Sequence, residues 1–282
     1  MTAVARLLSD GRRLHLQHGP IDMIVEAWGP PAAVAAAYRA AAARFDGLLA
    51  ELVAELPALR SPGPEPLHGP VARAMAAAVA PFRPAFVTPM AAVAGAGAEA
   101  ILAALTAPGG ITRAYVNNGG DIAIHLAPGE RLTAAVAARS GMPDCVTVPA
   151  ESPVRGIATS GWRGRSWSFG IADAVTVLAP TAAMADAAAT MIANTVDLPA
   201  HPAITRRPAS EMQAESDLGG RPVTVAVGPL APADIARALE RGLAAAETFR
   251  ARGLVTAAAL FLAGETRLSG PFPALAPEPA LA

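Results

Sequence analysis

The chain has 282 residues, of which 53% are hydrophobic, 16% are charged and 4% are aromatic, and its formal net charge is −1. This length allows one large domain or two modest ones, and a near-neutral chain offers no general electrostatic attraction to nucleic acid. All 22 basic residues are arginine, which excludes Schiff-base catalysis by lysine and a Walker-type phosphate loop.

The N-terminal segment lacks the pattern of a signal peptide, because Asp10, Arg12 and Arg13 stand where the apolar centre belongs. We find no apolar run of the roughly 20 residues that a bilayer span requires. The single cysteine, Cys145, cannot form an internal disulfide, which fits a reducing compartment. We therefore expect a cytoplasmic protein without a membrane segment or a nucleic-acid partner.

The chain begins with a predicted hairpin and a long helix. Two β-like runs at 14–17 and 21–28 flank the turn Gly19-Pro20. A helix then begins at Pro30-Pro31 and carries an apolar stripe as far as Leu56. The Pro- and Gly-rich residues 61–70 cannot continue it, so they predict a loop or a boundary between substructures.

Two further helices are predicted at 71–80 and from Thr88 onward. The second contains Gly95 and Gly97, each of which costs about 1 kcal/mol relative to alanine in a helix. The glycines indicate a close approach by either backbone or ligand, and tight packing of this helix on a sheet is the interpretation we favour.

A second hairpin is predicted from strands at 114–117 and 122–126, joined by Asn118, Gly119, Gly120 and Asp121. The glycines permit positive φ and expose backbone N–H groups. The string has two interpretations, an ordinary turn or a bare-backbone platform for a flat ring or a phosphate.

Further strands are predicted at 132–138, 145–148 and 154–158, followed by a polar loop at 159–170. The loop carries hydroxyl, guanidinium and indole groups, a combination that suits a diphosphate and an aromatic ring. The candidate ligand-binding residues are Thr159, Ser160, Gly161, Arg163, Arg165 and Trp167.

A buried strand at 174–178 and a helix at 182–194 come next. Asp186, Thr190 and Asn194 are spaced four apart and share one helix face. Their oxygens are hard ligands that Mg²⁺ accepts, although such a face is more often simply solvated. The rest predicts a strand at 223–227, a helix at 232–250, an apolar run at 255–262 and a disordered Pro/Ala-rich tail at 265–282.

Several of these strings together resemble the ApbE superfamily, whose characterised members are FAD:protein FMN transferases. They are T-P-M-A-A-V-A-G-A-G-A-E-A, N-N-G-G-D-I, A-T-S-G, A-D-A-V-T-V-L-A-P and A-D-A-A-A-T. An ApbE-like branch also shares the opening D-G-R-R-L-H-L-Q-H-G-P-I-D-M-I-V. The resemblance implies an α/β (α+β) fold with tandem T-fold-like subdomains, antiparallel or mixed sheets and packed helices. It covers the chain from Arg6 to about Gly264, and we expect a single ApbE-like domain at 1–264 built of two intertwined subdomains.

The resemblance also implies a flavin nucleotide, FAD or FMN, near the Gly-Gly-Asp turn and the Thr-Ser-Gly loop. Asp186 and Thr190 match the residues that ligate Mg²⁺ in the transferases, beside the FAD diphosphate. Asp173 and Asp121 are the candidate bases, and an acceptor protein would supply the attacking hydroxyl. The sequence identifies neither that protein nor whether the chain forms a homo-oligomer.

Two departures from the transferase pattern divide the hypotheses. The segment 165–173 replaces a His-x-Ile-Asp-Pro-type element, and Ala94-Gly95-Ala96 replaces a Lys-Gly element. The retained Asp186 and Thr190 favour Mg²⁺-dependent FMN transfer or FAD hydrolysis. The missing elements favour a binding protein that keeps the flavin site without the chemistry.

Overall fold

The computed structural model describes residues 2–139 and 142–271, with side chains described outside 136–144. Contacts group these residues into two compact units whose segments interleave along the chain. The first unit comprises residues 1–132, 147–158 and 180–186, and the second comprises 133–146, 159–179 and 187–282. Residues 61–70, which the sequence offered as a boundary, lie inside the first unit.

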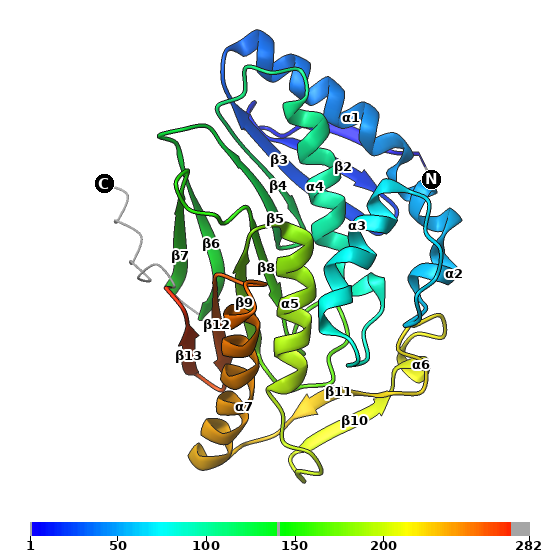
Figure 1. The fold of residues 1–282 in the computed structure, drawn as a ribbon, viewed down its shortest axis with the longest axis vertical. Helices are drawn as coiled ribbons and strands as arrows, with labels where there is room; N and C mark the ends of the chain where they lie inside the picture. Colours follow the sequence, from blue (N-terminus) through cyan, green and yellow to red (C-terminus); the bar gives the residue numbers. More distant parts are fainter. Residues whose placement is uncertain (1, 140–141, 272–282) are drawn as a thin grey trace. The chain divides into compact units, whose positions relative to one another are not determined.

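The first unit is an antiparallel sheet with helices packed on it (Figure 1). Its strands follow the order β1-β2-β3-β4-β5-β8, and each pair from β1 to β5 is antiparallel, as is β5 with β8. The strands are β1 (Val4–Leu7), β2 (Leu14–His18), β3 (Ile21–Trp28), β4 (Arg113–Asn118), β5 (Asp121–Leu126) and β8 (Gly156–Ser160). The helices are α1 (Pro31–Ala54), α2 (Leu56–Leu59), α3 (Pro70–Val79) and α4 (Val93–Thr106), with short 3₁₀ turns η1 (Ala80–Phe82) and η2 (Pro89–Ala92).

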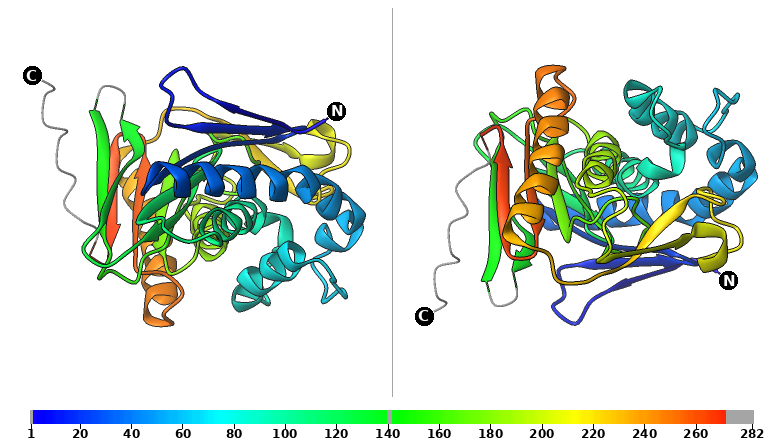
Figure 2. Two further views of the ribbon diagram at one scale, coloured as in Figure 1. Left: turned by 90° about the horizontal axis from the view of Figure 1, so that it is seen from above. Right: turned by 90° about the horizontal axis from the view of Figure 1, so that it is seen from below.

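The core of this unit forms where α1 and α4 cover the strands (Figure 2). The buried face of α1 presents Ala37, Ala41, Phe45 and Leu48 at helical spacing. Met23 on β3 is fully buried. Burial of a large apolar side chain such as Phe45 contributes roughly 1.5–3 kcal/mol. The predicted stripe is confirmed at Phe45, Leu48 and Leu52, whereas Leu56 lies in α2, because α1 ends at Ala54.

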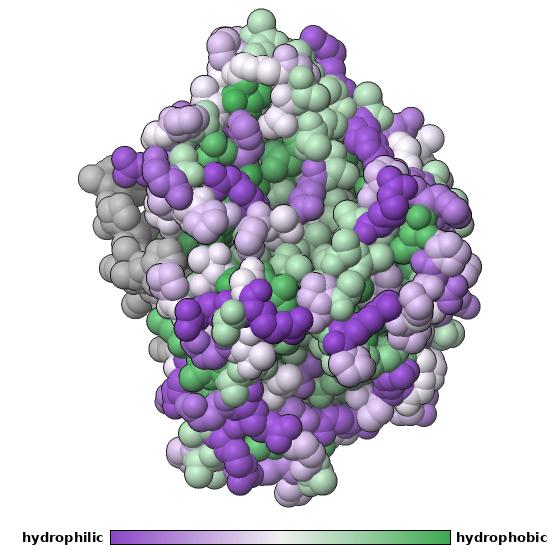
Figure 3. Space-filling model, in the orientation of Figure 1, coloured by the Kyte–Doolittle hydropathy of each residue, from purple (hydrophilic) through white to green (hydrophobic). Residues whose placement is uncertain are grey.

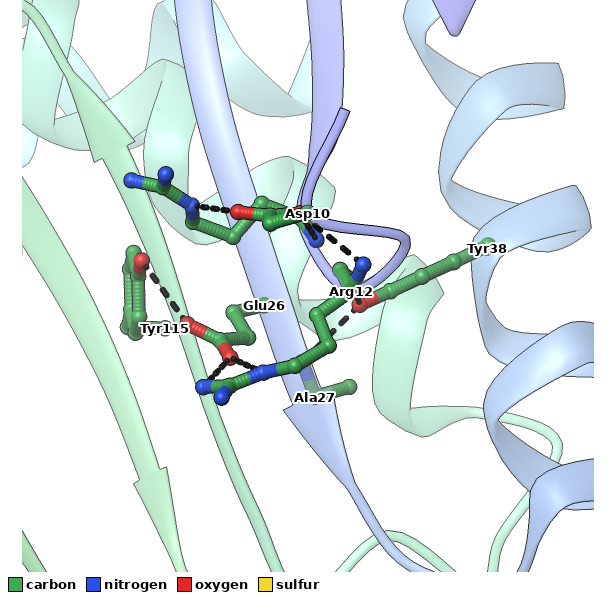
Figure 4. A network of polar contacts seen from close by, with 7 residues as sticks. Asp10, Arg12, Glu26, Ala27, Tyr38 and Tyr115 are labelled. Carbon is green, nitrogen blue, oxygen red and sulfur yellow. Dashed lines mark hydrogen bonds and ion pairs between the residues drawn. The ribbon is translucent and has the colours of Figure 1, made fainter. Parts of the chain in front are cut away.

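A polar network holds the loop between β1 and β2 (Figure 4). Arg12 donates from Nε and Nη2 to Glu26 Oε1, at 3.0 and 2.5 Å, and the Tyr115 hydroxyl donates to Glu26 Oε2 at 3.2 Å. Tyr38 on α1 donates to the Arg12 carbonyl at 2.5 Å and accepts the Ala27 N–H at 3.3 Å. Glu26 is buried, and its partners satisfy both carboxylate oxygens.

The segment Pro89–Thr106 corrects one expectation from the sequence. It has a mean hydropathy of 1.4 over 18 residues, which meets the length and composition of a membrane span, and 44% of it is buried in the structure. Alanine and the aliphatic side chains of Val93, Ile101, Leu102 and Leu105 supply this hydropathy, and α4 packs against α1, β4 and β5 as a core helix. On the molecular face in Figure 3, apolar residues are interspersed with polar ones.

The second unit contains an antiparallel sheet in the order β9-β12-β13, with α7 packed on β12 and β13. Separate two-stranded pairs join β10 with β11 and β6 with β7. The strands are β6 (Arg131–Arg139), β7 (Met142–Pro149), β9 (Ala174–Ala179), β10 (Ile204–Pro208), β11 (Pro222–Val227), β12 (Ala257–Leu262) and β13 (Glu265–Ser269). The helices are α5 (Ala182–Thr195), which begins in the first unit, α6 (Ala209–Met212) and α7 (Pro232–Ala251).

The α+β class with antiparallel sheets and packed helices is therefore confirmed. The tail prediction is wrong for its first residues, because 265–269 form β13 and pair with β12. The remainder of the predicted tail, from 272, lies outside the described residues.

Candidate functional site

The oxygen-bearing face of α5 is the partly exposed row of an otherwise largely buried helix. Asp186, Thr190 and Asn194 are all of intermediate exposure, whereas Ala185, Ala187–Ala189 and Met191–Ala193 are buried. The three oxygen-bearing side chains are thus partly accessible to solvent, as are Met184 and Thr195 on the same helix.

Asp186 is held at the beginning of α4. Its Oδ2 accepts the N–H of Gly95 at 3.0 Å. The pKa of Asp186 is raised well above its usual value, first by burial and then by the negative charge of Asp121, while the amides of Gly95 and Ala94 oppose the shift. A carboxylate that is destabilised by burial and by a neighbouring acid is typical of a functional position.

The glycine hairpin meets the same helix end. Asn118 pairs with Asp121 across the turn, and Gly119 and Gly120 have φ of 66° and 115°. The Asn118 side-chain amide donates to the Ala94 carbonyl at 3.0 Å. The first unit thus brings the Asn118–Asp121 turn and Asp186 together around the first turn of α4.

The polar loop in the second unit is anchored at its C-terminal half. The N–H of Phe169 donates to Asn194 Oδ1 at 2.9 Å, and the N–H of Thr224 donates to the Ser168 carbonyl at 2.8 Å. The tip from Arg163 to Ser166 is exposed, and Trp167 is partly exposed. Asn194, which the sequence placed on the oxygen face, therefore anchors this loop.

The predicted ligand-binding residues of this loop differ in exposure and in their hydrogen-bond contacts. The Thr159 hydroxyl lies 2.9 Å from the Thr176 hydroxyl on β9. Ser160 is partly exposed and Gly161 is buried, whereas Arg165 is exposed at the tip. Only the tip residues combine exposure with charge.

Arg163 is fixed in orientation by two neighbours. Its Nε lies 2.6 Å from Asp173 Oδ1, and its guanidinium carbon lies 4.6 Å from the centre of the Trp162 ring. The Arg163 side chain is 62% exposed. Among the residues that the structure describes, neither terminal nitrogen of Arg163 has a hydrogen-bond partner, so both remain for an anion.

Asp173 is occupied on both oxygens. Oδ1 accepts from Arg163, and Oδ2 accepts the Ala263 N–H at 2.6 Å. These contacts join the loop to the turn between β12 and β13. The role of Asp173 as a base stays a prediction, and its described contacts orient Arg163.

The contacts of Glu99 and Thr224 were not identified from the sequence. Both residues act through partners more than 50 residues away in the chain, Ala183 and Phe169, and no local motif marks them. Within the described part of the chain, no group of three or more His, Cys, Asp and Glu side chains is placed to hold a metal ion.

Comparison with known proteins identifies a family that covers most of the chain and curated relatives that match slightly less than half of it. Residues 5–268 match the family model described as AbpE bacteria. UPF0280 protein MK0206 of Methanopyrus kandleri is 39% identical over 124 residues, which cover 44% of this chain and 48% of the relative. A UPF0280 protein of Methanosphaerula palustris is 42% identical over 135 residues, which cover 46% and 55%. The chain thus spans about half the length of the curated relatives it matches.

Among solved structures, the chain is similar to the apo form of the flavinyl transferase ApbE from Pseudomonas stutzeri. The TM-score is 0.52 at 15% sequence identity, with 95% of each chain covered. At this identity the likeness shows a shared fold.

Proposed function

The chain belongs to the AbpE bacterial family, and from this premise we propose that it binds a flavin nucleotide, FAD or FMN, in the cytoplasm. The observation that carries the proposal is the guanidinium of Arg163, which is held by Asp173 and lies over the Trp162 ring, with no hydrogen-bond partner on its terminal nitrogens among the described residues. A guanidinium held in place binds a phosphate with little further loss of side-chain entropy. The structural neighbour named as a flavinyl transferase supports the flavin as the ligand.

The remaining ligand contacts are assigned by chemistry. Arg165 and Trp167 at the same tip supply a second cation and an aromatic face. Thr159, Ser160 and Gly161 supply hydroxyls and backbone at the beginning of the loop. In the first unit, Gly119 and Gly120 leave the turn between Asn118 and Asp121 without a covering side chain, so a flat ring can lie against it.

The donor set near α5 fits a divalent cation in its chemistry. Asp186 and Thr190 would hold Mg²⁺, because they offer hard oxygens one turn apart. The neighbouring charges of Asp121 and Asp186 are also an arrangement that a cation relieves. When bound, Mg²⁺ would neutralise diphosphate charge and make its phosphorus more electrophilic.

The reaction that suits these groups is transfer of FMN from FAD. An acceptor hydroxyl forms a bond to the FMN phosphorus, the diphosphate bond breaks, and AMP leaves. Water in place of the protein hydroxyl gives hydrolysis. Asp121 takes the proton of the attacking hydroxyl, with Asp173 as the second candidate base.

A second candidate function is flavin binding without chemistry. The observation that favours it is Asp173, whose two oxygens are committed to Arg163 and Ala263. The absence of lysine from the chain removes the Lys-Gly element of the transferases as well.

The experiment compares Arg163→Ala with Arg237→Ala in binding to FAD, FMN and riboflavin. The two arginines are matched, because each is paired with an aspartate and their side chains are 62% and 64% exposed. Loss of a charge-assisted contact of about 1.5–3 kcal/mol weakens binding roughly 10- to 100-fold. We expect this loss for FAD and FMN with Arg163→Ala only, and no change for riboflavin, which has no phosphate.

Incubation with FAD and MgCl₂ then separates the two functions. AMP release that disappears in Asp186→Ala supports the enzyme, and flavin binding without AMP supports the binding protein. Equal FAD affinity in both arginine variants refutes the role of Arg163.

A further inference from the structure

Helices α4 and α5 exchange carboxylates at their N-terminal ends. Asp186 on α5 accepts the N–H of Gly95 in the first turn of α4 at 3.0 Å. Glu99, one turn further along α4, accepts the N–H of Ala183 in the first turn of α5 at 3.1 Å. Asp186 thereby pairs an amide that the first turn of α4 leaves unpaired, and Glu99 does the same for the first turn of α5. Each carboxylate also places negative charge at the positive N-terminal end of the other helix.

The backbones of the two helices touch at this point. A Cβ atom at Gly95 would lie 2.2 Å from the Ala182 carbonyl oxygen. No side chain therefore separates α4 from the beginning of α5. The relative position of the two helix ends is set by this backbone contact and by the two carboxylate contacts.

The beginning of α5 has a second, weaker restraint. The Thr181 hydroxyl accepts the Met184 N–H at 3.2 Å, which caps α5 locally but does not attach it to α4. The backbone of Gly156 on β8 also packs against this end, since a Cβ atom there would lie 2.3 Å from the Thr181 carbonyl oxygen. Glu99 supplies a side-chain hydrogen bond that attaches the first turn of α5 to α4. Asp186 lies three residues after Ala183, about 4.5 Å along the helix axis, so a shift of the first turn moves its carboxylate directly.

We propose that Glu99 is a positioning residue for Asp186. By holding the first turn of α5 against α4, it fixes the carboxylate that the proposed function assigns to a divalent cation. The inference rests on the proposed function for the cation, whereas the helix contact stands on its own geometry.

The test measures the affinity of the full chain for Mn²⁺ alone, from the electron paramagnetic resonance signal of the free ion. Loss of a residue that orients a metal ligand lowers metal affinity about 10- to 100-fold, and we expect this for Glu99→Ala. Glu99→Gln should bind like wild type, because its amide oxygen still accepts the Ala183 N–H.

Glu55→Ala is the matched control for stability. Glu55 accepts the N–H groups of His68 and Gly69 at 2.6 and 2.7 Å, next to the start of α3 in the same unit. Glu55→Ala should lower the unfolding midpoint, as Glu99→Ala does, but it should leave the Mn²⁺ affinity of the protein unchanged. Equal Mn²⁺ affinity in wild type and Glu99→Ala overturns the inference and leaves the cation assignment intact.

The cation assignment fails if the wild-type protein binds no Mn²⁺, or if Asp186→Ala binds Mn²⁺ with unchanged affinity. In either case a second measurement tests the positioning role of Glu99 without a metal. Urea unfolding of Glu99→Ala, Asp186→Ala and the double variant forms a cycle. Non-additive losses are expected, because each carboxylate depends on the helix end that the other holds. Additive losses overturn the positioning role.

Discussion

A methyl group added at Gly95 tests the close contact between α4 and α5. The ideal Cβ would lie 2.2 Å from the Ala182 oxygen, 2.5 Å from its carbonyl carbon and 2.8 Å from the Ala183 nitrogen. All three are backbone atoms, so no side-chain rotation relieves the overlap and the helices must separate. Such overpacking costs about 1–3 kcal/mol, and loss of the Gly95–Asp186 hydrogen bond costs about 1–3 kcal/mol more. The higher helix propensity of alanine relative to glycine offsets about 1 kcal/mol of this loss.

We therefore expect Gly95→Ala to lower the free energy of unfolding by roughly 1–5 kcal/mol. Urea unfolding followed by circular dichroism measures it. Gly47→Ala is the matched control, because Gly47 lies within α1 and a Cβ added there would meet no atom within 4 Å, and it should gain about 0.5–1 kcal/mol. Equal stability of the two variants would refute the close approach.

The remaining predictions concern two titrating groups. The pKa of Asp186 is raised in the folded protein by burial and Asp121, so its contribution to stability falls as pH rises from its unfolded value of about 3.9. Asp186→Asn keeps a hydrogen-bond acceptor but removes the charge. The free energy of unfolding of Asp186→Asn, measured in urea, should therefore rise relative to that of wild type from about pH 4 to pH 7. A difference that is constant with pH contradicts the raised pKa of Asp186. Burial, followed by Glu26, raises the pKa of Tyr115 to about 12. In a Tyr38→Phe background, Glu26→Gln should lower the pKa of Tyr115, which is measured from tyrosinate absorbance. An unchanged titration would show that Glu26 does not raise this pKa.

Elements with strong local signals were predicted from the sequence. The helix expected at 182–194 is observed as α5 (Ala182–Thr195), because Pro180 ends the preceding strand and alanine favours the helix throughout. The hairpin of β4 and β5 was found because its two glycines require a turn with positive φ. Close packing at Gly95, the favoured interpretation there, is observed, but its partner is the backbone of Ala182 in helix α5 and not a sheet.

Elements that depend on distant pairing were missed. β10 contains Arg206 and Arg207 and does not alternate clearly, yet it pairs with β11. β13 was included in the Pro/Ala-rich tail, although Glu265–Ser269 contain neither residue type, and pairing with β12 makes them a strand. Strand pairing across the chain outweighs local composition in both cases.

In the candidate site, too, the sequence identified side chains by their local position but not their distant partners. The sequence identified Asp186 from its helix position, but its partner Gly95 is 91 residues away. It suggested Arg163 as an anion ligand without indicating that Asp173 and Trp162 fix its orientation. Local spacing indicates which side chains share a face, whereas their partners depend on the folded chain.

Binding of a flavin nucleotide through its phosphate can be measured by calorimetric titration of the purified protein with FAD, FMN and riboflavin. We expect saturable binding of FAD or FMN that is tighter than that of riboflavin. No heat of binding with any of the three, from a protein whose circular dichroism shows it folded, would contradict it.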